Sequence, residues 1–170
     1  KMTASTDAEV FNFEGNLEKS FADYLTAEGL TIATSNSPGT LPSDFVAVSV
    51  AISGVHEDEH MSQRPYYGNL EYDHYKGSVT LTVHSDRVTD EQPSIGFLRY
   101  HKELVSKARA ALSIMRAYDD GGLNNYIEYY AINRLLPSGT DYESDDMQYD
   151  ETTLSFDLDF TILTKAWPIG

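Results

Sequence analysis

The chain has 170 residues, of which 12 are lysine or arginine and 27 are aspartate or glutamate, so its formal net charge is −15. This length suits one domain with a substantial core, and 41% hydrophobic residues are too many for a disordered acidic tail. The acidity excludes the usual route to nucleic acids and to anionic membranes, which is a cluster of lysine and arginine. The absence of cysteine excludes disulfides, thiol nucleophiles and thiolate metal sites.

Membrane insertion is not expected from the sequence. A membrane helix needs ~20 consecutive apolar residues, whereas the most apolar stretch, residues 45–55, is short and contains Ser49, Ser53 and Gly54. The first residues, KMTASTD, lack the apolar core of a signal peptide. We therefore expect a soluble protein without a membrane partner.

Two segments have apolar residues at the three- and four-residue spacing that predicts a helix with one buried face. The first covers residues 8–28, with Asp7 as a cap and Gly29 as a stop. The second covers residues 97–117. Its apolar stripe includes His101, which we interpret as a core histidine with satisfied hydrogen bonds rather than as a ligand.

Alternation of apolar and polar residues predicts four long strands, at residues 45–53, 70–85, 126–136 and 153–164. Residues 30–34 are a shorter candidate, and Gly77 is expected to mark a bulge. Residues 138–151 are interpreted as an acidic loop, and residues 56–69 as a polar hairpin connection. The side chains expected to face the core include Val79, Leu81, Val83, Leu154, Phe156, Leu158, Phe160 and Ile162.

This order of elements predicts the fold class. Consecutive strands that are joined without a helix pair in antiparallel fashion, and each expected strand has one polar face. The sequence therefore predicts an α+β fold, in which a mainly antiparallel sheet packs against two helices on one face and is joined by long hairpin loops. We expect one domain over residues 1–170.

Residues 56–60 read HEDEH and match the H-E-x-x-H pattern of zinc peptidases. That pattern works on a helix, where residues four apart share a face and two histidines reach one zinc ion. Here the segment follows a strand, and Pro65 would interrupt a helix. We interpret the segment as a solvated hairpin loop. A small metal-dependent hydrolase that uses His56, Glu57 and His60 stays open as the alternative from another functional class.

Two groups of acidic residues are further candidate sites. A calcium loop that starts at Asp141 needs glycine where Asp146 stands and glutamate where Thr152 stands, so a solvated or partner-facing charge run is the better interpretation. Asp157 and Asp159 share one strand face about 7 Å apart, which is more typical of the wet side of a sheet than of a catalytic pair. We expect no catalytic residue, no metal, no cofactor and no enzymatic activity.

The composition favours a protein that makes contacts with other proteins. The chain has 12 tyrosines against one tryptophan, and tyrosine is enriched at protein interfaces. An apolar patch around Trp167 follows the last strand. The candidate contact residues are Tyr66, Tyr67, Asp141, Glu143, Asp145, Asp146, Asp150 and Trp167.

In the order of its expected helices and strands and in their residue patterns, the chain resembles the tail terminator (tail completion) proteins of long-tailed bacteriophages. The resemblance covers nearly the whole chain and is carried by the segments NLEKSFADYLTAEG, FVAVSVAIS, GSVTLTVHS, HKELVSKARAAL and TTLSFDLDFTIL. The family has no sharp catalytic motif, so the resemblance transfers no residue role.

The resemblance implies a structural virion protein of the tail and neck, assembled in the host cytoplasm. It implies a homo-hexameric ring that caps the tail tube and joins the tail to the head, with the tail tube protein and a head-completion (stopper) protein as partners. An acidic lumen, with Asp157 and Asp159 as candidates, would let DNA pass without tight binding. The length of the chain leaves other neck, adaptor or minor tail proteins open, and a stand-alone acidic adaptor is a third possibility.

Overall fold

A computed structural model of the chain describes residues 9, 11–33, 42–55, 74–86, 99–113, 122–128, 130–145 and 148–162. In chain order, its helices and strands are α2 (Phe13–Ala27), β1 (Asp44–Val55), β2 (His74–Asp86), α4 (Arg99–Ala111), the 3-10 helix η3 (Leu123–Tyr126), β3 (Tyr130–Asp145) and β4 (Tyr149–Ile162).

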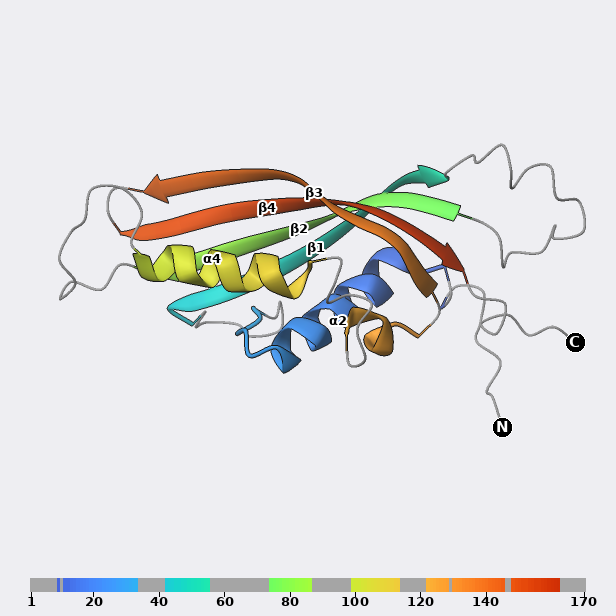
Figure 1. Ribbon diagram of the computed structural model, residues 1–170, viewed down its shortest axis with the longest axis horizontal. Helices are drawn as coiled ribbons and strands as arrows, with labels where there is room; N and C mark the ends of the chain where they lie inside the picture. Colours follow the sequence, from blue (N-terminus) through green and yellow to red (C-terminus); the bar gives the residue numbers. More distant parts are fainter. Residues whose placement is uncertain are drawn as a thin grey trace, which may run out of the picture.

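The four strands form one antiparallel sheet in the order β1-β2-β4-β3. Figure 1 shows α2 and α4 on the same side of this sheet, whereas no described element covers the other side. The predicted fold class, an α+β arrangement of two helices and an antiparallel sheet, is confirmed. We call the uncovered side the outer face.

The core lies between the helices and the inner face of the sheet. Because side chains alternate along a strand, every second residue of β2 and β4 points toward the helices, and the predicted core residues with described side chains are buried: Val79, Leu81, Val83, Leu154, Phe156, Leu158 and Phe160. Helix α2 adds Leu17, Phe21, Tyr24 and Leu25 at helical spacing. The Tyr24 hydroxyl donates to the carbonyl oxygen of Ala111 at 2.7 Å, which ties the two helices together.

Both helices are shorter than the sequence predicts, within the residues that the structure describes. Asn12 caps α2 by accepting a hydrogen bond from the Gly15 N–H, whereas the expected cap Asp7 lies outside the described residues. Gly29 follows α2 with a φ of 90°, as expected of a helix stop. Of the short strand candidate at residues 30–34, a single parallel bridge between Ile32 and Val46 is present. Neither described helix is long and apolar enough to span a membrane.

The prediction of an acidic loop at residues 138–151 is wrong. Strand β3 continues to Asp145 and β4 begins at Tyr149, so most of this segment is paired strand. The physical reason is that the acids alternate with residues that suit a sheet: Asp141 and Glu143 point to the outer face, while Tyr142 pairs with Thr152. At its other end, β3 starts at Tyr130 rather than at residue 126, which is the last residue of η3.

The irregularity expected at Gly77 lies on the neighbouring strand. Ile52 pairs with Gly77 and Gly54 pairs with Lys76, so Ser53 of β1 is the extra residue of a bulge. Gly77 provides the space for it, because a Cβ atom at Gly77 would lie 2.5 Å from the carbonyl oxygen of Ala51. The polar hairpin connection predicted at residues 56–69 lies outside the described residues, as do residues 70–73 of the strand predicted at residues 70–85.

Candidate functional site

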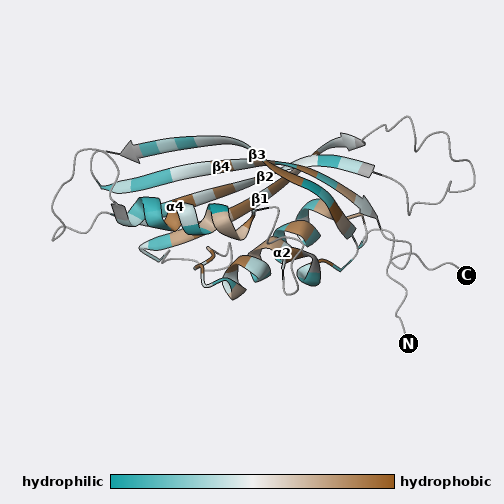
Figure 2. Cartoon of the chain, viewed as in Figure 1, coloured by the Kyte–Doolittle hydropathy of each residue, from teal (hydrophilic) through white to brown (hydrophobic). Residues whose placement is uncertain are grey.

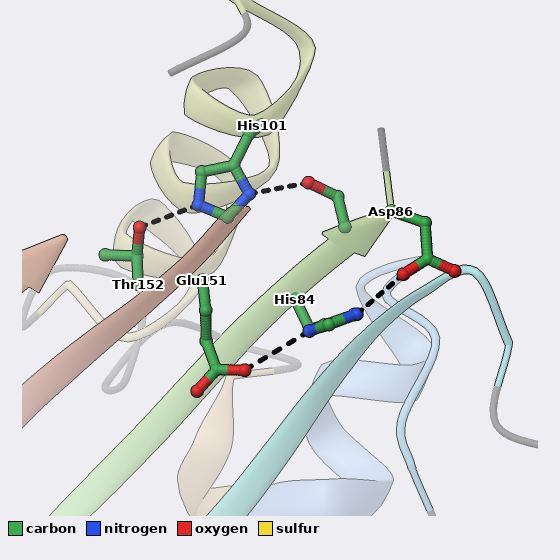
Figure 3. A network of polar contacts seen from close by, with 6 residues as sticks. His84, Asp86, His101, Glu151 and Thr152 are labelled. Carbon is green, nitrogen blue, oxygen red and sulfur yellow. Dashed lines mark hydrogen bonds and ion pairs between the residues drawn. The ribbon is translucent and has the colours of Figure 1, made fainter. Parts of the chain in front are cut away.

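A buried polar contact joins α4 to the sheet. His101 is fully buried, with its Nδ1 atom 2.7 Å from the Ser85 hydroxyl of β2 and its Nε2 atom 2.7 Å from the Thr152 hydroxyl of β4 (Figure 3). A hydroxyl can donate or accept, so either tautomer of the neutral ring is satisfied on both sides. Ser85 is 3% exposed, which leaves a substrate no access to its hydroxyl. The interpretation of His101 as a satisfied core histidine is confirmed.

A second histidine lies on the outer face. The Nδ1 atom of His84 is 3.2 Å from Glu151 Oε2, and its Nε2 atom is 2.9 Å from Asp86 Oδ1 (Figure 3). Its ring is stacked on Phe45 at 4.8 Å and contacts Tyr149 at 4.9 Å between centroids. These contacts of the His84 ring join β2 to β1 through Phe45 and to β4 through Glu151 and Tyr149.

The predicted acidic residues gather on the outer face in two groups. Asp141 and Glu143 are exposed near the end of β3, and Glu143 lies directly opposite Glu151. Asp157 is exposed and Asp159 is half-buried farther along β4, and they share one face as predicted. Asp157 lies six positions after Glu151 on β4, so the two groups are about 20 Å apart at the usual rise of a strand.

Other predicted site residues are not brought to this surface. Asp150 is completely buried, and its place in the ladder between Ser85 and Ser144 puts it on the inner face, so it is not available to a partner. Asp145 is the last residue of β3. The remaining predicted residues lie outside the described residues: Tyr66, Tyr67, Asp146 and Trp167, together with His56, Glu57 and His60 of the hydrolase alternative.

The described residues offer little room for a metal ion or a small ligand. No group of three histidine, aspartate or glutamate side chains among them could hold a metal ion. One hollow of about 190 Å³ is lined by residues that include Lys19, Asp23 and Tyr126, and another of about 210 Å³ by Asp44 and Tyr100, whose hydroxyl donates to Asp44. Both are smaller than the ~300 Å³ from which ligand pockets usually start.

A basic surface that was not singled out from the sequence lies on α4. Lys102, Lys107 and Arg109 are exposed, while His101, Val105 and Ala108 of the same helix are buried against the sheet. The Lys107 ammonium donates to the carbonyl oxygen of Gly29 at 3.3 Å, and the Arg109 guanidinium to the Thr140 hydroxyl at 3.5 Å. In the sequence, these cations lie opposite the apolar stripe of the helix. An ordinary solvated helix face has the same pattern, so the pattern alone does not indicate a binding surface.

Neither a protein-family model nor a curated protein matches the chain in sequence. The resemblance to tail terminator proteins therefore rests on the order of the helices and strands and on their residue patterns.

Proposed function

We propose that the chain is a structural, non-enzymatic protein of the phage neck, which forms a homo-hexameric ring, caps the tail tube and joins the tail to the head. The observation that carries this proposal is the one-sided two-layer fold. A helix and two strands are followed by a second helix and two strands, both helices cover one face, and the other face is left to make contacts (Figure 1). This is the order of elements on which the resemblance rests.

The chemistry of the outer face supports a protein that works through contacts. Its centre carries small side chains on three neighbouring strands, namely Ala47, Ser49, Ser78, Thr80, Thr82, Thr153 and Ser155. Figure 2 shows that the strand ends next to α4 are hydrophilic, with the apolar residues concentrated nearer the middle of the fold. A polar face of this kind suits contacts with other proteins or with water rather than a buried substrate.

Passage of DNA follows from the sign of the charge. Carboxylates repel phosphates, so a channel lined by them lets a duplex slide without tight binding. Asp157 is the better lumen candidate of the predicted pair, because its cross-strand neighbours Ser78 and Leu136 carry no charge. Asp159 lies between Lys76 and Arg134, which offset its charge locally.

The proposal is tested by the mass of the full chain in solution, alone and with the tail tube protein, together with a zinc titration. We expect an oligomer, with a hexamer in the presence of the tube protein, and no tight zinc binding. A strict monomer that binds zinc tightly would favour the hydrolase alternative instead.

A further inference from the structure

Helix α4 concentrates positive charge in a strongly acidic chain. Its 13 residues, RYHKELVSKARAA, contain four of the 12 basic residues of the chain and one acid. Lys102, Lys107 and Arg109 are exposed, and among the described residues none of the three forms an ion pair. Lys102 and Arg109, seven residues apart, share one side of the helix, whereas Lys107 lies about 140° around it at 3.6 residues per turn. We call Lys102 and Arg109 the α4 basic surface. Neither of the two forms an ion pair with an acid of the described residues.

The outer face of the sheet concentrates negative charge at one end. Asp141, Glu143, Glu151 and Asp86 lie on neighbouring strands there, and we call them the acidic end. Glu143 faces Glu151 across the ladder, which is an unfavourable pairing of like charges. Asp141 and Glu143 form no ion pair within the described residues, whereas Glu151 and Asp86 contact the two ring nitrogens of His84.

These two surfaces lie back to back at the same end of the molecule. His101 of α4 contacts Ser85 and Thr152 from the inner face, and the residues next to these two in sequence, His84, Asp86 and Glu151, project to the outer face (Figure 3). The molecule therefore has a cationic helix on one side of the sheet and carboxylates on the other.

The edges of the sheet are poorly suited to adding a strand from another copy. On β1, the Val46 N–H donates to the Thr31 carbonyl at 2.8 Å, and the Val50 N–H donates to Glu18 at 2.9 Å. On β3, Pro137 lacks an N–H group, and register shifts leave Asn133 and Ser138 as extra residues. Proline, bulges and covered donors are ways in which proteins block edge pairing. Contact between copies is therefore more accessible to the outer face of the sheet and to the helices than to the sheet edges.

We propose that the α4 basic surface of one copy packs on the acidic end of the next copy. This inference rests on the self-association proposed above and names the surfaces that meet. The contact brings Lys102 and Arg109 against Asp141 and Glu143, which form no ion pair within the described residues. The small residues beside the acidic end, such as Ala47, Thr82 and Thr153, allow a helix to approach. Because two different surfaces meet, the contact is heterologous, and repeating it makes a ring when the rotation closes.

Charge reversal tests the contact directly. Lys102→Glu/Arg109→Glu reverses both cations of the α4 basic surface, and Asp141→Lys/Glu143→Lys reverses the two carboxylates that face them in the proposed contact. We expect either variant alone to raise the dissociation constant of assembly at least about tenfold, as loss of close charge pairs does. An equal mixture of the two variants restores assembly, because each reversed surface then meets its complement. The four changes in one chain restore it as well.

The measurement is sedimentation velocity at one fixed ionic strength, since salt weakens the contact and also screens the general repulsion between acidic copies. The matched control for the second variant is Asp23→Lys/Glu128→Lys, which changes the net charge equally at two exposed positions elsewhere. It should not restore assembly in a mixture with Lys102→Glu/Arg109→Glu. Circular dichroism checks that each variant is folded.

Three results would overturn the proposed contact. Assembly that neither reversal changes would leave the ring standing and remove these surfaces from it. Loss of assembly that the mixture does not restore would mean that the residues act on folding rather than across the interface. A wild-type chain that stays monomeric at every concentration, with and without the tail tube protein, would remove the contact and the ring together.

Discussion

His101 fixes how α4 lies on the sheet, because its two ring nitrogens contact hydroxyls on two different strands, Ser85 on β2 and Thr152 on β4. All three side chains are buried, so water does not replace a lost partner. A buried hydroxyl that is left without a hydrogen bond costs about 1–3 kcal/mol. The contact thus stabilises one orientation of the helix.

We expect His101→Leu to lower the free energy of unfolding by about 2–4 kcal/mol, since it leaves both hydroxyls unsatisfied in an otherwise intact core. Urea denaturation measures the loss. The triple variant Ser85→Ala/His101→Leu/Thr152→Val removes the stranded hydroxyls and should regain part of the stability. If the single variant were as stable as the wild type, His101 would not hold the layers together.

The sequence predicts the role of His101 but not its partners. The three- and four-residue spacing of apolar residues places the histidine on the buried face of a helix. Ser85 and Thr152 are 16 and 51 residues away from it, and only the register of β2 with β4 brings them to opposite sides of the ring. For the same reason the burial of Asp150 could not be read from an acidic segment.

At the scale of elements, the edge of β1 depends on a helix side chain. The carboxylate of Glu18 on α2 accepts the hydrogen bond of the Val50 N–H, which would otherwise point outward from an edge strand. The contact is partly buried, so it also couples α2 to the sheet.

Glu18→Ala should therefore destabilise the protein by about 1–2 kcal/mol, because hydrogen bonds to charged groups are among the stronger ones. It should also increase aggregation on heating, which light scattering detects, since the uncovered edge can pair with another chain. Glu18→Gln keeps an oxygen acceptor and should lose less. Equal stability of the alanine variant and the wild type would argue that the edge is covered by other means.

Two glycines provide a matched test of the β1 bulge. A Cβ at Gly77 would lie 2.5 Å from the Ala51 carbonyl oxygen and 3.0 Å from the Ile52 side chain, whereas a Cβ at Gly139 of β3 meets no atom within 4 Å. We expect Gly77→Ala to cost about 1–3 kcal/mol through displaced backbone. Gly139→Ala should stay within about 0.5 kcal/mol of the wild type, as most exposed substitutions do. Chemical denaturation of both variants compares them, and equal losses would contradict the close approach at the bulge.

The elements that the sequence predicts well are those with an apolar face. The alternation in β2 and β4 identifies the buried side chains, because burial of every second residue leaves a direct pattern. The alternation does not predict the extension of β3 to Asp145, since residues 137–143 are all exposed and leave no apolar face, and they form a strand by pairing with β4. Their pairing depends on a partner strand rather than on their own composition.

For the whole molecule, the central property is how the charge is distributed. Six copies at −15 each carry −90, so a ring must place carboxylates where they either meet cations or face solvent. In the proposed ring, the acidic end and the α4 basic surface would supply the first arrangement, and Asp157 the second. The sequence shows the excess of acid, but only the fold places α4 with Lys102 and Arg109 behind the strand ends that carry Asp141 and Glu143.

Imaging is the most direct test of the proposal that the chain is a ring protein of the phage neck. Cryo-electron microscopy of purified virus particles that contain the chain, with the chain marked by a specific antibody fragment, locates it in the particle. We expect six copies in a ring at the junction of head and tail, between the tail tube and the head-completion protein. Particles in which the label lies elsewhere, or is missing although the chain is expressed, would contradict the proposed function.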